Sequence, residues 1–159
     1  FWSVLLTPCW SNKLQPLAMS TLPHLSSAYS VEQAVLGEQS KVLCLRFGQD
    51  FSPECMKMDE VLTSAAQTVE SACSIYAVDV RDVPESVTEF QLAAPAQLIF
   101  FFRGKALALD LGRGPQRQVD FVPNSRQEFL DLVEAVCRGA QQGMTLIMAP
   151  KDYSMQFGY

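Results

Sequence analysis

Residues 41–60 read KVLCLRFGQDFSPECMKMDE, and they carry the clearest signals for the fold. Its first part, residues 41–47, is a compact apolar run of the kind that forms a buried strand. Residues 48–53 (GQDFSP) are typical of a loop, and apolar side chains recur at helical spacing from residue 54 to about residue 69. The stretch therefore predicts a buried strand, a short loop and a long helix, with Cys55 near the start of that helix.

The segments around this junction alternate between helices and strands. Helical spacing predicts a short helix that ends before Gly37, and an apolar run predicts a second buried strand over residues 74–80. Asp82 and Pro84 open a short helical segment after this strand. The order up to this point is helix, strand, helix, strand, helix.

The second half of the chain predicts a hairpin and a closing helix. Two apolar runs, residues 97–103 and 106–111, flank a turn that contains Gly104, and a loop over residues 112–124 follows. The pattern Ser125-x-x-Glu128 is a capping box that starts the last helix. This order is the thioredoxin arrangement, an α/β fold with a mixed central β-sheet flanked by helices on both faces.

The length of 159 residues and the absence of repeats predict one domain with two extensions. The first methionine is Met19, so residues 1–18 are expected to be an N-terminal extension. Residues 19–143 are expected to form the thioredoxin-like domain, and residues 144–159 a C-terminal tail. The leader lacks acidic residues, which leaves open a plastid or mitochondrial protein, although an Arg-rich transit peptide is not apparent.

The charge balance excludes several classes of protein. There are 17 acidic and 12 basic residues, a net charge of −5, and His24 is the single histidine. Gripping nucleic acid requires clustered Lys and Arg, and a histidine-rich metal site requires more histidines. No run approaches the roughly 20 apolar residues of a membrane span. We therefore expect no metal, no cofactor and no membrane association.

The cysteines indicate a reducing compartment rather than a disulfide framework. Their number is odd, their spacing is irregular, and no C-x-x-C motif is present. Cys44 lies in an apolar run and Cys137 lies near the apolar face of the last helix, so both are expected to be buried. The five cysteines are Cys9, Cys44, Cys55, Cys73 and Cys137.

Cys55 has the position of a redox cysteine but lacks its partners. A helix N-terminus lowers a thiol pKa, yet a dithiol enzyme also needs a resolving thiol. In a thioredoxin interpretation the first cysteine of the pair is Ser52, and the position of the buried acid is Arg46. Glu54 would also oppose thiolate formation. Ser52 and Cys55 are thus interpreted as vestigial redox positions, and the alternative is a monothiol redox protein that uses Cys55.

Residues 46–60 (RFGQDFSPECMKMDE) closely resemble the signature of the Dim-type (Dib-type) thioredoxin-like proteins of the spliceosomal U5 snRNP. The resemblance runs in order from Met19 to Tyr159, and CMKMDE and PKDYS are its most specific motifs. It also includes residues 22–25 (LPHL), 75–79 (IYAVD), 100–103 (FFFR), 110–112 (DLG), 138–140 (RGA) and 150–154 (PKDYS).

The resemblance implies a catalytically silent adaptor in the U4/U6.U5 tri-snRNP that is needed for pre-mRNA splicing in the nucleus. Such a protein docks on large scaffold proteins of the U5 snRNP and tri-snRNP, and it comes close to spliceosomal snRNA through the particle. Many members carry a second cysteine after the proline that precedes the FFF strand. Here that residue is Ala96, so no bridge from Cys55 to that position is possible.

Two groups of residues are candidates for partner contacts. The first lies at the junction and comprises Asp50, Phe51, Lys57, Asp59 and Glu60. The second lies in the tail and comprises Lys151, Asp152, Tyr153, Phe157 and Tyr159. Large aromatic side chains dominate interface energetics, which favours the tail as an anchor.

Overall fold

Strand β2 (Val42–Gly48) lies inside a mixed five-stranded sheet. The structure, a computed structural model, describes residues 22–149 apart from residues 93, 113 and 124. Strand β2 pairs in parallel with β3 (Cys73–Asp79) and antiparallel with β4 (Ala96–Phe102). Two short strands, β5 (Lys105–Ala106) and β8 (Gln118–Val119), pair with β4. The strand expected over residues 41–47 is therefore β2, which lies between the two other long strands, β3 and β4.

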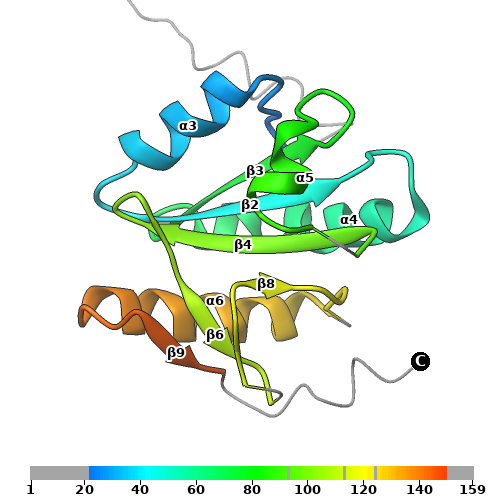
Figure 1. Cartoon of the computed structure of the whole chain (residues 1–159). Coiled ribbons are helices and arrows are strands. Elements are labelled where there is room, and N and C mark those ends of the chain that lie inside the picture. The colour runs from blue at the N-terminus through cyan, green and yellow to red at the C-terminus, as the bar shows by residue number, and fades with distance from the viewer. Residues whose placement is uncertain (1–21, 93, 113, 124, 150–159) are drawn as a thin grey trace, which may run out of the picture.

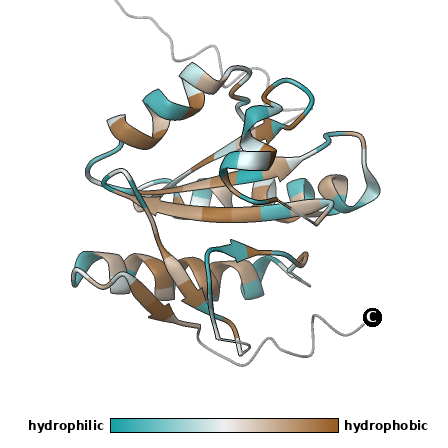
Figure 2. Cartoon of the chain, viewed as in Figure 1, coloured by the Kyte–Doolittle hydropathy of each residue, from teal (hydrophilic) through white to brown (hydrophobic). Residues whose placement is uncertain are grey.

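The two faces of this sheet carry separate apolar cores, because successive side chains of a strand point to opposite faces. Helix α3 (Ala28–Gly37) and the short helix α5 (Glu85–Glu89) lie on one face, where Leu43 and Leu45 point (Figure 1). Helices α4 (Pro53–Val69) and α6 (Arg126–Gln141) cover the other face, where Cys44 points. Figure 2 shows the apolar strands between these layers. The expected α/β class with helices on both faces is confirmed.

The expected helix starts are confirmed by their caps. The Ser125 side chain accepts a hydrogen bond from the Glu128 N–H at 3.2 Å, so α6 begins at Arg126. Ser52 caps α4 in the same way, and the helix begins at Pro53, one residue earlier than expected. Proline suits this position because the first N–H of a helix has no partner within the helix. None of the helices in the described part of the chain is long and apolar enough to cross a membrane.

The hairpin expected after β4 is only partly correct. Residues 106–111 do not form one strand, because the backbone changes partners at Leu107. Strand β5 stays with β4, whereas β6 (Ala108–Asp110) lies in a second sheet between β7 (Pro115–Gln116) and β9 (Leu146–Met148). The loop expected over residues 112–124 therefore contains β7 and β8.

Strand β9 pairs in parallel with β6 and lies beyond residue 143, where the tail was expected to begin. Ile147 of this strand is buried against α6. A pairing between a three-residue strand and a distant segment leaves no local periodicity that a sequence pattern could reveal.

Candidate functional site

Cys55 lies in the first turn of α4, at the end of β2. The Ser52 hydroxyl caps the helix by accepting from the Cys55 backbone N–H at 3.2 Å. Strand β2 ends at Gly48, whose φ of +152° is rarely adopted by other residues. A Cβ on Gly48 would lie 2.3 Å from the Cys55 Sγ and 2.5 Å from the Pro95 carbonyl oxygen. The close approach of β2, α4 and the start of β4 therefore requires glycine here.

The Cys55 side chain is fully buried rather than presented to solvent, with an exposed fraction of 0%. Burial raises the pKa of its thiol above the ordinary value. The Ser52 hydrogen bond and the Arg46 charge oppose this rise, and the carboxylates of Asp59 and Asp50 add to it. Glu54, the neighbour expected to oppose the thiolate, is exposed. The pKa of the Cys55 thiol is therefore raised by its surroundings although the residue lies at a helix N-terminus.

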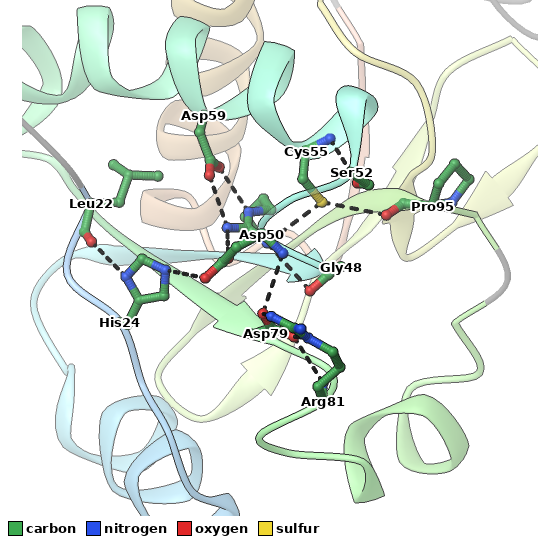
Figure 3. A network of polar contacts seen from close by, with 11 residues as sticks. Leu22, His24, Gly48, Asp50, Ser52, Cys55, Asp59, Asp79, Arg81 and Pro95 are labelled. Atoms are coloured by element: carbon green, nitrogen blue, oxygen red, sulfur yellow. Dashed lines mark hydrogen bonds and ion pairs between the residues drawn. The ribbon is translucent and has the colours of Figure 1, made fainter.

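The position that the family resemblance pairs with Cys55 is adjacent to it in space. The Cys55 thiol lies 3.4 Å from the Pro95 carbonyl oxygen and donates to it (Figure 3). Ala96 follows Pro95 and pairs with Gly48 across β2 and β4. A cysteine at position 96 would thus lie beside Cys55, but the alanine offers no sulfur. Cys44 and Cys137 are also buried, as expected.

Arg46 is the centre of the polar network beside this thiol, and none of its surface is exposed. Its guanidinium Nε and Nη2 atoms donate to the two carboxylate oxygens of Asp59 at 2.8 and 2.9 Å. Nη2 also donates to Asp50 at 2.5 Å, and Nη1 points to the Gly48 carbonyl and the Cys55 sulfur. Burial works to lower the pKa of Arg46, but the hydrogen bonds to Asp50 and Asp59 raise it overall. A permanent cation therefore occupies the place of a proton-handling acid.

His24 ties the N-terminal segment of the described chain to this network. Its Nε2 atom lies 2.9 Å from Asp50, and its Nδ1 atom lies 2.9 Å from the Leu22 carbonyl oxygen (Figure 3). The Leu25 N–H donates to the Ala77 carbonyl, and the Ala77 N–H donates to the Pro23 carbonyl. Residues 22–25 thus lie along the free edge of β3, and Asp50 is held from two sides.

Asp79 extends the network to the surface at the end of β3. Its carboxylate accepts from the Arg81 guanidinium at 2.8 Å and from the Asp50 backbone N–H at 3.3 Å. These contacts lower the pKa of Asp79 from 3.8 to about 2, and the hydrogen bond from the Arg81 side chain has the largest effect. The Arg81 guanidinium lies over the Phe51 ring, 4.4 Å from its centre. This cation–π contact orients Phe51, which is 57% exposed.

The residues predicted to contact partners divide into three groups. Phe51, Lys57 and Glu60 are exposed near the start of α4. Asp50 and Asp59 are half-buried and are already paired with Arg46. The predicted tail contacts lie outside the described residues, namely Lys151, Asp152, Tyr153, Phe157 and Tyr159.

Two depressions flank the network. A hollow of about 530 Å³ lies on the His24 side, with Asp50, Asp59 and Glu60 in its lining but a mostly apolar surface. A groove of about 290 Å³ lies on the Ser52 side and is mostly apolar, with Val80, Leu92 and Pro95 in its lining. Among the described residues, no group of three or more His, Cys, Asp or Glu side chains is arranged to hold a metal ion. Both depressions offer apolar surface, and the exposed Glu60 adds a charge at the edge of the first.

The sequence interpretation missed the role of Arg46 and His24 in holding the junction together. A signal for Arg46 was present, because a charged residue inside the apolar run of residues 41–47 must find partners if the strand is buried. The partner Asp59 is 13 residues away and His24 joins through Asp50, so only the folded chain brings them together. No sequence pattern indicated the contact between Arg81 and Phe51.

Solved structures show what kind of fold surrounds this site. Thioredoxin from Fasciola hepatica superposes with a TM-score of 0.56 at 12% identity, over 71% of this chain and 97% of that chain. Thioredoxin from Malassezia sympodialis superposes with a TM-score of 0.54 at 16% identity, over 73% of this chain and 90% of that chain. The fold is thus thioredoxin-like, as the order of elements predicted.

Curated relatives share much more of the sequence. Mitosis protein dim1 of Schizosaccharomyces pombe is 39% identical over 87% of this chain and 97% of its own length. Spliceosomal protein DIB1 of Eremothecium gossypii is 37% identical over 84% of this chain and 93% of its own length. The model of the family described as mitosis protein DIM1 matches residues 21–153. The chain therefore belongs to the DIM1 family, as residues 46–60 indicated.

Proposed function

We propose that this protein is a non-catalytic thioredoxin-like adaptor subunit of the U4/U6.U5 tri-snRNP, acting in the nucleus in pre-mRNA splicing. The observation that carries the proposal is the similarity, over nearly the whole of their length, to proteins named spliceosomal protein DIB1. The partners are large scaffold proteins of the U5 snRNP and tri-snRNP. Spliceosomal snRNA then lies near this protein within the particle without being bound by it directly. A net charge of −5 does not favour direct binding to phosphates.

The state of Cys55 supports a non-catalytic role. Its sulfur is enclosed by Arg46 and the Pro95 carbonyl, its pKa is raised by burial, and position 96 offers no resolving thiol. A monothiol enzyme needs an accessible thiolate, for which these surroundings are unsuitable. The structure therefore does not favour the monothiol alternative.

The exposed start of α4 is one surface that the described residues offer to a scaffold protein. Met56, Lys57 and Glu60 are exposed at helical spacing, and Phe51, whose ring is oriented by Arg81, is exposed in the loop that leads into the helix. Rigid aromatic and Arg side chains with small entropic cost are typical anchors of interfaces. We therefore assign Phe51 as the main anchor here, with Lys57 and Glu60 at its rim.

Affinity purification of the tagged full chain from nuclear extract tests the proposal. We expect U5 proteins and the U4, U5 and U6 snRNAs to co-purify. Phe51→Ala should reduce their yield several-fold, and deletion of residues 151–159 should also weaken it. Gln67→Ala, an exposed change at the other end of α4, is the control and should leave the yield unchanged. Purification without splicing components would contradict the proposed function.

Cys55→Ser separates the adaptor from the monothiol alternative. The serine hydroxyl is small enough for the site and can donate to the Pro95 carbonyl, so the fold should persist. We expect the variant to support splicing in cells depleted of the native protein. Loss of splicing by a variant whose unfolding free energy is unchanged would favour the monothiol enzyme instead.

A further inference from the structure

Strand β9 is the outermost strand of the second sheet and presents apolar side chains to solvent. Ile147 faces α6 and is 3% exposed, whereas Leu146 and Met148 on its other face are 40% and 63% exposed. Figures 1 and 2 show this strand at the margin of the molecule, coloured as hydrophobic. Exposed apolar strands at a sheet edge are rarely left uncovered.

The open edge of β9 is defined by its hydrogen bonds to β6. The Ala108 N–H donates to the Thr145 carbonyl at 3.0 Å, and the Ala149 N–H donates to the Asp110 carbonyl at 3.1 Å. Alternate residues of a strand direct their backbone groups to opposite edges. The N–H and C=O groups of Leu146 and Met148 therefore point away from β6, to an edge where no other described strand pairs.

The sequence that follows β9 has the pattern of an amphipathic strand. Residues 153–159 read YSMQFGY, in which apolar residues alternate strictly with small or polar ones. The apolar positions are Tyr153, Met155, Phe157 and Tyr159. The four residues before them, 149–152, read APKD, and proline at the second position is favoured in a type I turn.

We propose that residues 153–157 form a strand that pairs antiparallel with the open edge of β9. A four-residue loop over residues 149–152 joins the two strands, a length that hairpins commonly build around a type I turn. This register places Met148 opposite Tyr153 and Leu146 opposite Met155. Both pairs exchange backbone hydrogen bonds, as the direction of the Leu146 and Met148 backbone groups requires.

The side chains independently support the same register. Residues directly opposite each other in an antiparallel pair lie on one face, so Met148 meets Tyr153 and Leu146 meets Met155. Contacts between methionine sulfur and aromatic rings are favourable. A slip of one residue would place Ser154 opposite Met148 and move the apolar stripe to the other face.

The short connection to β9 favours the tail of the same chain as the strand that pairs with its open edge. Only four residues separate Met148 from Tyr153, so closing the loop costs little entropy. A strand from a second copy or from another protein would have to overcome the cost of association. The inference does not rest on the proposed function.

Residue-resolved hydrogen exchange by NMR tests the pairing in the full chain. We expect the Leu146 and Met148 amides to exchange slowly at any protein concentration. Met155→Pro removes an N–H that faces β9 and should speed exchange of both amides at least tenfold. Ser154→Pro is the matched control, because its N–H would face solvent, where an edge strand tolerates proline. The Ala149 amide, bonded to Asp110, should stay slow in all three proteins.

Three outcomes would overturn the proposal. The first is fast exchange of Leu146 and Met148 in the native chain. The second is an equal effect of the two proline variants, since the register requires only one of the two N–H groups to be bonded. The third is protection that increases with protein concentration, because this would assign the edge to a second copy.

Discussion

The start of α4 and the edge strand β9 differ in which of their side chains they bury. At the start of α4, a thiol and a guanidinium are both withdrawn from solvent, and carboxylates surround the cation. At β9, Leu146 and Met148 are left on the surface and only Ile147 is buried. At the start of α4 the reactive thiol and the cation are thus enclosed while the neighbouring Phe51 and Met56 stay exposed, whereas at β9 the strand itself presents apolar side chains to solvent.

The two regions also differ in how they respond to change. A buried ion pair tolerates the loss of a partner poorly, because the remaining charge stays buried without compensation. The stability of a closely packed apolar contact depends instead on the volume of its side chains, since close packing leaves no room for an added methyl group. Substitutions at Arg46, Gly139 and Asp79 test this difference.

Arg46→Ala should have the largest effect. It leaves a cavity in the core and removes the cation that holds Asp50 and Asp59. We expect the free energy of unfolding to fall by about 2–5 kcal/mol, chiefly because a large buried side chain is lost, since the half-buried Asp50 and Asp59 can still reach water. Urea denaturation followed by circular dichroism measures the change.

Arg117→Ala is the control for this substitution, because Arg117 is an exposed arginine. Its unfolding free energy should change by less than about 0.5 kcal/mol. A similarly small effect of Arg46→Ala would show that the network does not hold the junction together.

Gly139→Ala tests packing behind β9. Alanine favours a helix by about 0.5–1 kcal/mol over glycine, which alone would stabilise α6. However, a Cβ at position 139 would lie 2.8 Å from the Ile147 Cγ1 atom, so one of the two elements must move. We expect a net loss of about 1–3 kcal/mol in the urea unfolding free energy.

Gly37→Ala is the matched control, because nothing lies within 4 Å of a Cβ at that helical position. It should be neutral or slightly stabilising. In an Ile147→Ala background, Gly139→Ala should cost less than in the native chain, since the clashing atom is gone. Equal costs in both backgrounds would contradict the close contact between α6 and β9.

Asp79→Asn should have the smallest effect and should change the acid dependence of stability. The folded pKa of Asp79 is about 2, below the ordinary 3.8, so its contribution is present above pH 3.8 and is lost as the pH falls toward 2. We expect the variant to be less stable by about 1–2 kcal/mol at pH 7 and to approach the native chain near pH 2. Urea unfolding between pH 2 and pH 7 measures this convergence.

The exposed Asp131 on α6 provides the corresponding control. Asp131→Asn should leave the difference between pH 7 and pH 2 unchanged. Parallel curves for Asp79→Asn and the native chain would mean that the ion pair with Arg81 does not stabilise the folded state.

Much of the fold could be predicted from local patterns. The apolar run of residues 41–47 and the helical spacing after it gave β2 and α4, because burial and periodicity are properties of neighbouring residues. The start of α6 could be predicted from Ser125, because its capping contact is with Glu128, only three residues further along the chain. The apolar run of residues 106–111 contained β6 but did not reveal its partners, and β8 and β9 could not be predicted because each pairs with a segment far away in the chain.

The candidate site divides in the same way. Cys55, Ser52 and the missing second thiol at Ala96 could be identified from position and from family resemblance. The ring of contacts around Arg46 could not, because Asp59 and His24 approach it from separate elements. The exposure of Phe51 and its contact with Arg81 depend on how two loops meet.

The sequence by itself determined the order of elements, the family and the absence of a resolving thiol at position 96. These depend on residue identity and on contacts between neighbours. The tertiary structure alone decided that Cys55 is buried, that a cation is enclosed beside it, and that β9 has an open edge. Burial and charge pairing arise where distant segments meet in three dimensions, and there the pKa of Cys55 is raised although its place on the helix would lower it.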